Sequence, residues 1–87
     1  MAMQGTGYIY HWRVNDGVGR IRICTCSFAD LNVPFSGQDC DAALRTVLSK
    51  GNISRPRECP PPDGALRVRF SLEVRDGNLV ATDISQS

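Results

Sequence analysis

Arginine is the side chain whose chemistry stands out in this sequence, because Lys50 is the only lysine among ten basic residues. The planar guanidinium fork suits phosphates and base edges, and it can also stack on planar rings. Arg13, Arg20 and Arg22 lie close together shortly after a run of ring residues. They form either a patch for an anionic ligand or part of an ordinary charged surface, and the sequence supports both interpretations equally.

Ring residues precede these arginines in an alternating stretch. Under strict strand alternation Tyr8, Tyr10 and Trp12 share one face, while Ile9 and His11 take the other. Tyr10 and Trp12 are therefore either exposed rings that can stack on a ligand or rings that fill one end of the core. His11 has no nucleophile or metal-like cluster near it in the sequence, so a structural role competes with a binding role.

The sequence lacks the patterns that catalysis or metal binding would need. It shows no paired carboxylates on a rigid element, no nucleophile elbow and no phosphate-binding loop that leads into a helix. We therefore predict that the protein is not an enzyme and has no cofactor and no metal site. The four cysteines match no zinc-site spacing, and we expect free thiols rather than disulfides. They are Cys24, Cys26, Cys40 and Cys59.

Length and composition are those of a single small globular domain. The chain has 87 residues, of which 41% are hydrophobic and 22% charged, and its formal net charge of +1 gives no overall field that attracts nucleic acid. No apolar run approaches the ~20 residues of a transmembrane helix. We expect a monomer in the cytoplasm, with the nucleus as the alternative location.

The C-terminal part of the sequence predicts a β-hairpin. Residues 66–74 alternate strictly between apolar and polar side chains, which is typical of a strand with one buried face. Gly77 can adopt a positive φ and marks a tight turn. Residues 79–84 are then the returning strand.

Strands are also predicted in the N-terminal part. Ile21 and Ile23 alternate with polar residues, and residues 15–17 form the turn before them. Residues 31–35 alternate in the same way, and Pro34 within them indicates an edge strand or a bulge.

A long connection separates the third predicted strand from the fourth. Asp39 or Asp41 can cap a short helix over residues 42–48, which stops at Gly51. Residues 54–64 are rich in proline and predict an irregular loop. Five strands with one long connection are typical of a small closed barrel.

Four short motifs occur in order along the chain. They are a glycine-initiated strand with two rings (Gly7, His11, Trp12), G-x-G-x-I at residues 17–21, D-x-x-V-x-F-S at residues 30–36, and the closing pattern of Val68, Phe70, Ala81 and Ile84. Together these motifs resemble the cold-shock domain family.

The resemblance implies one all-β domain over residues 1–87, a five-stranded Greek-key barrel of the oligonucleotide-binding (OB) type. Strands one to three would lie in residues 6–36 and strands four and five in residues 66–84. Residues 37–65, which match the family poorly, would form the long, partly helical and proline-rich connection between strands three and four.

The resemblance also implies a function, the binding of single-stranded nucleic acid by base stacking on exposed rings over a basic surface. We expect RNA rather than DNA as the ligand, and a role as one module of a larger RNA-binding protein. The candidate binding residues are Tyr10, His11, Trp12, Arg20, Arg22 and Phe35. Replacing Trp12 by alanine would then weaken binding without unfolding the barrel.

The sequence departs from the family at positions that bind nucleic acid. Asp16 replaces a lysine, Val18 and Arg20 replace rings, and Asn32 and Pro34 replace a ring and a histidine. Losing three rings removes roughly 3–6 kcal/mol of gross stacking energy, so we expect weak binding. Arginine contacts would compensate in part and would be sensitive to salt.

These departures leave an alternative open, a cold-shock-like barrel that has lost nucleic-acid binding and serves as a protein-interaction or spacer module. Its contact surface would be the loop at residues 54–64 or the helix at residues 42–48. Surface charge separates the two hypotheses. A contiguous arginine stripe favours nucleic acid, whereas arginines paired with Asp16, Asp30 and Glu73 favour the alternative. The stripe would consist of Arg13, Arg20, Arg22 and Arg69.

Overall fold

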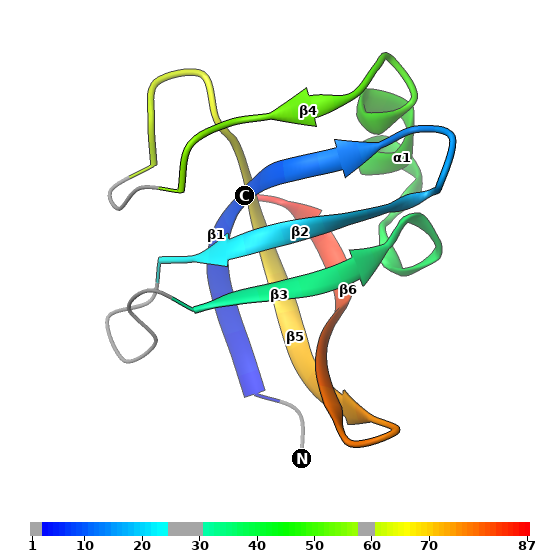
Figure 1. Ribbon diagram of the computed structural model, residues 1–87, viewed down its shortest axis with the longest axis vertical. Coiled ribbons are helices and arrows are strands. Elements are labelled where there is room, and N and C mark those ends of the chain that lie inside the picture. The colour runs from blue at the N-terminus through cyan, green and yellow to red at the C-terminus, as the bar shows by residue number, and fades with distance from the viewer. Residues whose placement is uncertain (1–2, 25–30, 58–60) are drawn as a thin grey trace.

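The computed structural model describes residues 3–24, 31–57 and 61–87, and most of them belong to antiparallel β-strands (Figure 1). The strands are β1 (Met3–Arg13), β2 (Val18–Ile23), β3 (Asn32–Ser36), β4 (Ile53–Ser54), β5 (Leu66–Arg75) and β6 (Asn78–Gln86). A 3-10 turn, η2 (Gly37–Asp39), and the helix α1 (Ala42–Leu48) follow β3.

The strands form one curled sheet in the order β3-β2-β1-β5-β6, and the short β4 pairs with the C-terminal end of β1. The curl brings the end strands β3 and β6 into contact. The fold is thus mostly β, a half-barrel with one short helix. The position of β3 at the end of the hydrogen-bonded order confirms the edge strand that Pro34 indicates.

The β5–β6 hairpin forms where the sequence predicts it. Val68, Phe70 and Leu72 are buried on the inner face of β5, as the alternation of apolar residues requires. The turn is made by Asp76 and Gly77, with φ of +52° and +80°. Two consecutive positive φ values match the twist of the flanking strands, so this turn fixes the register of the hairpin.

A β-bulge in β1 changes which of its residues face inward. Ile9 pairs with Ile21 and His11 pairs with Arg20, so that Tyr10 is an extra residue between two paired positions. Because of this insertion Ile9 and Trp12 both point into the core. The strict alternation assumed from the sequence, which would put Tyr10 and Trp12 on one face, is therefore wrong at this point.

Two glycines let the strands approach closely at the curl. A Cβ at Gly7 would collide with the carbonyl oxygen of Arg22, and a Cβ at Gly19 would collide with that of His11 and with the ring of Phe35. Side chains at either position would push β1 and β2 apart.

Helix α1 closes one end of the curled sheet, far from the turn of the β5–β6 hairpin (Figure 1). Asp41 caps it, its carboxylate accepting a hydrogen bond from the Leu44 N–H at 2.8 Å. Leu44 and Leu48 are buried against the sheet. The helix predicted over residues 42–48 is confirmed. None of the helices formed by the described residues is long and apolar enough to cross a membrane.

Candidate nucleic-acid interface

The outer face of β1, β2 and β3 carries most of the residues that the sequence singles out. The strand register places His11, Arg20 and Pro34 side by side in one row across this face. Asn32 lies in the next row, beside Arg22. Of these side chains Arg20 is exposed and His11, Asn32 and Pro34 are half-buried, so the first row is open to a ligand.

Hydrogen bonds to Asn32 on β3 fix the orientation of the Arg20 side chain on this face. Its Nε and Nη2 donate hydrogen bonds to Oδ1 of Asn32 at 2.9 and 2.7 Å. The guanidinium has five N–H donors, so this fork leaves donors for a phosphate or a base edge. Asn32 thus orients the guanidinium of Arg20 on this face.

The segment that follows β4 borders the same face. The Arg55 N–H donates to the Tyr10 carbonyl at 2.8 Å, and the Tyr8 hydroxyl donates to the Pro56 carbonyl at 2.6 Å. The guanidinium carbon of Arg57 lies 5.9 Å from the centre of the Tyr10 ring, a cation–π arrangement. The sequence predicts an irregular surface loop here, with protein contacts only as one alternative, and nothing in it predicts that this segment pairs with β1 beside Tyr10.

Trp12 and Phe35 do not belong to the exposed face. Only 5% of Trp12 and 4% of Phe35 is exposed, and their rings stack with centroids 5.5 Å apart at 13°. The Trp12 indole N–H also donates to the Leu48 carbonyl at 2.8 Å. Both rings are part of the core in this structure, and the exposure that base stacking would require is not found.

Arg22 is buried as well, with 5% of its surface exposed. Its Nη1 donates to the carbonyl oxygens of Ile23 and Leu31 at 2.8 and 3.3 Å. The guanidinium therefore satisfies backbone acceptors near the end of β2. The expected role of Arg22 in phosphate or base contact conflicts with this burial.

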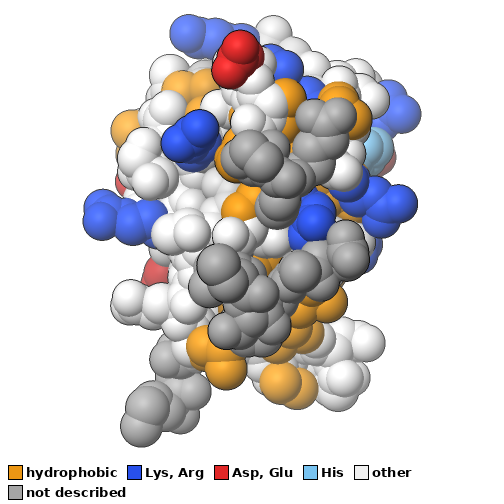
Figure 2. Space-filling model, turned by 90° about the vertical axis from the view of Figure 1, so that its left-hand side faces the viewer, with side chains coloured by type: hydrophobic (Ala, Val, Ile, Leu, Met, Phe, Trp, Pro, Cys, Tyr) orange, Lys and Arg blue, Asp and Glu red, His pale blue; other side chains and the backbone are white. Residues whose placement is uncertain are grey.

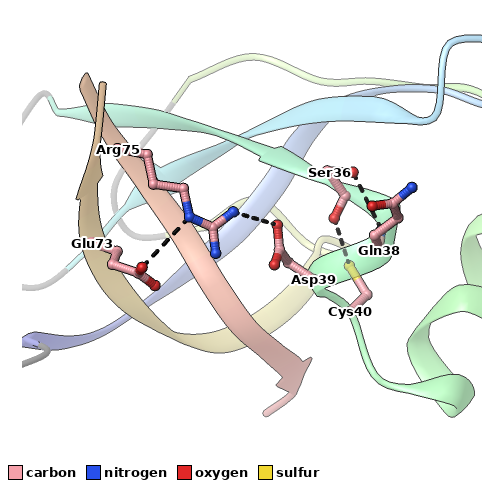
Figure 3. Close-up of polar contacts among 6 residues, drawn as sticks. All are labelled: Ser36, Gln38, Asp39, Cys40, Glu73 and Arg75. Atoms are coloured by element: carbon pink, nitrogen blue, oxygen red, sulfur yellow. Dashed lines mark hydrogen bonds and ion pairs between the residues drawn. The ribbon is translucent and has the colours of Figure 1, made fainter. Parts of the chain in front are cut away.

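The described ion pairs lie at the seam between β3 and β6, where Arg75 and Asp39 line a groove together with Pro34. Arg75 on the β5–β6 hairpin contacts Asp39 at 3.7 Å and Glu73 at 3.5 Å (Figure 3). Among the described parts of the chain no carboxylate pairs with the other exposed arginines of the sheet and its border. These are Arg13, Arg20, Arg55, Arg57, Arg67 and Arg69.

The arginines form a border around the ring residues rather than one straight stripe. On one side of β1, Arg67 of β5 pairs with Tyr8 and Arg69 pairs with Thr6. On the other side, Arg20 of β2 pairs with His11. Figure 2, which shows the side of the molecule that lies at the left of Figure 1, has Lys and Arg side chains at several places and few acidic ones. Asp30, one of the expected acidic partners, lies outside the described residues.

Two of the four cysteines lie in the described residues, and Cys26 and Cys59 lie outside them. Cys24 Sγ lies 3.9 Å from the carbonyl oxygen of Arg22, and Cys40 is a buried free thiol. Burial, with smaller contributions from Asp39 and Asp41, raises the pKa of the Cys40 thiol to about 12. The Cys40 thiol faces the Ser36 carbonyl, with Sγ and O 3.8 Å apart (Figure 3). Within the described ranges no group of three or more His, Cys, Asp or Glu residues could hold a metal ion.

Comparison with known proteins gives no family model, no curated protein and no solved structure that matches this chain.

Proposed function

We propose that this protein binds single-stranded RNA or DNA, weakly, on the outer face of β1, β2 and β3. The observation that carries the proposal is the open row of His11 and Arg20, which the Tyr10–Arg57 pair borders. No carboxylate of the described residues forms an ion pair with Arg20. The OB-type barrel topology is part of the same proposal, supported by the curled five-strand order and the contact between β3 and β6.

Binding would combine stacking with phosphate contacts. The imidazole of His11, the ring of Tyr10 and the guanidinium of Arg20 offer planar surfaces on which bases of any sequence can stack. Asn32 accepts from Arg20 through its oxygen and can donate to a base edge through its amide nitrogen. Exposed Arg13 would pair with phosphates along the border.

The burial of Trp12 and Phe35 makes the interface smaller than the sequence suggests. Each stacked base contributes about 1–3 kcal/mol. Two rings and one guanidinium at about 2 kcal/mol each give about 6 kcal/mol, which corresponds to a Kd on the order of tens of micromolar.

Fluorescence anisotropy with labelled U8 and dT8 strands tests the proposal. We expect saturable binding by the protein, and a loss of about 5-fold or more in affinity for both Arg20→Gln and His11→Ala. Arg75→Gln is the matched control, because it removes the same charge from an arginine that already has carboxylate partners. Equal affinities of the protein and Arg20→Gln, or equal losses in Arg20→Gln and Arg75→Gln, would contradict a specific interface.

A second candidate function is protein binding. It is favoured by exposed apolar side chains at the sheet surface, Val18 at 48% and Val74 at 68% exposure. The same titration separates the two functions. Absence of binding to every strand at low salt would reject nucleic-acid binding and leave protein binding as the better hypothesis.

A further inference from the structure

A groove adjoins the proposed interface. It lies between the C-terminal end of α1, β4 and the chain that leads into β5, and has a volume of about 630 Å³. Lys50 and Arg55 line it, together with Gly51 and Gly64 and several apolar side chains. These residues belong to the connection that matches the cold-shock family poorly, so the resemblance makes no prediction for this groove.

The chemistry of the lining suits a phosphate backbone. The described residues that line the groove include two cations and no carboxylate, and exposed Asp63 directly precedes the lining residue Gly64. A Cβ built on Gly51 would meet nothing within 4 Å, so the backbone there is open to a ligand. A Cβ on Gly64 would lie 3.7 Å from Nη2 of Arg55, which places the guanidinium over that glycine. No aromatic ring is among the described lining residues, and base stacking is therefore not the expected mode of contact.

The groove is continuous with the sheet face. Ser54 lines the groove and pairs with His11 in the β1–β4 ladder. Arg55 lines it too, and its backbone N–H donates to the Tyr10 carbonyl. A strand whose bases lie on Tyr10 and His11 therefore reaches the groove by passing Arg57 and Arg55.

We propose that this groove, lined by Lys50 and Arg55, binds the sugar-phosphate backbone of the nucleotides next to those that stack on Tyr10 and His11. The inference rests on the proposed function and extends it, because the connection between β3 and β5 becomes a part of the binding site. Short strands would occupy the sheet face alone, and longer strands would occupy both surfaces.

The test is a length series of labelled dT4, dT6, dT8 and dT12 strands with three proteins. The double variant Lys50→Gln/Arg55→Gln removes the two groove cations. The control Arg45→Gln/Arg75→Gln removes two positive charges outside the groove. All four replaced side chains are exposed, and thermal unfolding by circular dichroism checks that each variant folds.

We expect the groove variant to lose at most about 2-fold in affinity for dT4, because Arg55 also borders the sheet face, and to bind dT12 about 10-fold or more weakly. Its salt slope for dT12 should fall by about 1.4, because each phosphate contact on a single strand contributes about 0.7. The control should retain the length dependence. If the groove variant and the control both bind dT4, and their affinities rise equally with strand length, this inference alone would be overturned. Failure of all three proteins to bind any strand would overturn the proposed function as well.

Discussion

Trp12 is a structural residue, because its indole N–H donates to the Leu48 carbonyl and its ring packs on Phe35. Replacing it by alanine removes a buried ring and should lower the free energy of unfolding by about 3–5 kcal/mol. Urea unfolding followed by circular dichroism measures this change. Trp12→Phe is the matched variant, which keeps a ring and loses the hydrogen bond, at a cost of about 1–3 kcal/mol. Unchanged stability of Trp12→Ala would contradict the burial.

Cys40 provides a second prediction for a single residue. Burial keeps its thiol protonated, and the raised pKa of about 12 means that the reactive thiolate is scarce below that pH. We expect iodoacetamide to label Cys40 slowly in the folded protein at pH 8 to 9 and rapidly in urea, as read by mass spectrometry of the Cys40 peptide. Fast labelling of the folded protein at pH 8, at the rate found in urea, would be the contrary result.

Among the structural elements, helix α1 depends on its N-cap. Asp41→Ala removes the carboxylate that accepts from the Leu44 N–H and should destabilise the protein by about 1 kcal/mol. Asp41→Asn, which keeps an oxygen in the same place, should unfold close to the unmodified protein. The urea midpoints of the two variants give the comparison, and equal losses in both would show that capping is not the cause.

The close approach of β1 and β2 gives a further prediction for the sheet. Gly7→Ala should destabilise the protein, because its Cβ would collide with the backbone carbonyl of Arg22, which cannot move without opening the ladder. Gly51→Ala is the control, since its Cβ would meet open space. Thermal unfolding of the two variants should show a lower Tm for Gly7→Ala alone. A Tm for Gly7→Ala at or above that of Gly51→Ala would argue against the tight curl.

The elements could be predicted from the sequence where local signals are strong. The alternation of residues 66–74 with Gly77 after it predicts the β5–β6 hairpin, and Asp41 with its apolar stripe predicts α1. The bulge at Tyr10 could not be located from the sequence, because nearly every residue of this stretch is a ring or apolar. The resemblance, which requires an exposed His11 beside a core-facing Ile9, implies only that the strand bends. The two-residue β4 was missed for a similar reason, since its pairing with β1 is a tertiary contact.

The same limits apply to the candidate site. The sequence identifies His11, Arg20 and Tyr10, which the structure places on or beside one open face. It also suggests Trp12, whose burial depends on the bulge and on the packing of α1, and Phe35, which is buried with Val33 on the inner face of β3 as the alternation of residues 31–35 indicates.

At the scale of the whole molecule, a net charge of +1 does not prevent local attraction of an anion. The exposed arginines without described carboxylate partners surround the ring residues, whereas Arg75 is paired with Asp39 and Glu73. Function would therefore depend on where charges are placed rather than on their sum.

Salt dependence tests this distribution of charge. With three or four phosphate contacts, the affinity for dT8 should fall about 20- to 50-fold between 50 and 200 mM salt. Anisotropy titrations at several salt concentrations give the slope. An affinity that is independent of salt would show that the arginines make no phosphate contact.

The most direct measurement of the central claim is a ¹H–¹⁵N NMR titration of the protein with unlabelled U8. The account predicts shifts concentrated at the amides of Tyr10, His11, Arg20 and Asn32 and along residues 50–57, with little change in β6. Shifts confined to the β5–β6 hairpin, or spread evenly over the chain, would contradict binding on the outer face of β1, β2 and β3.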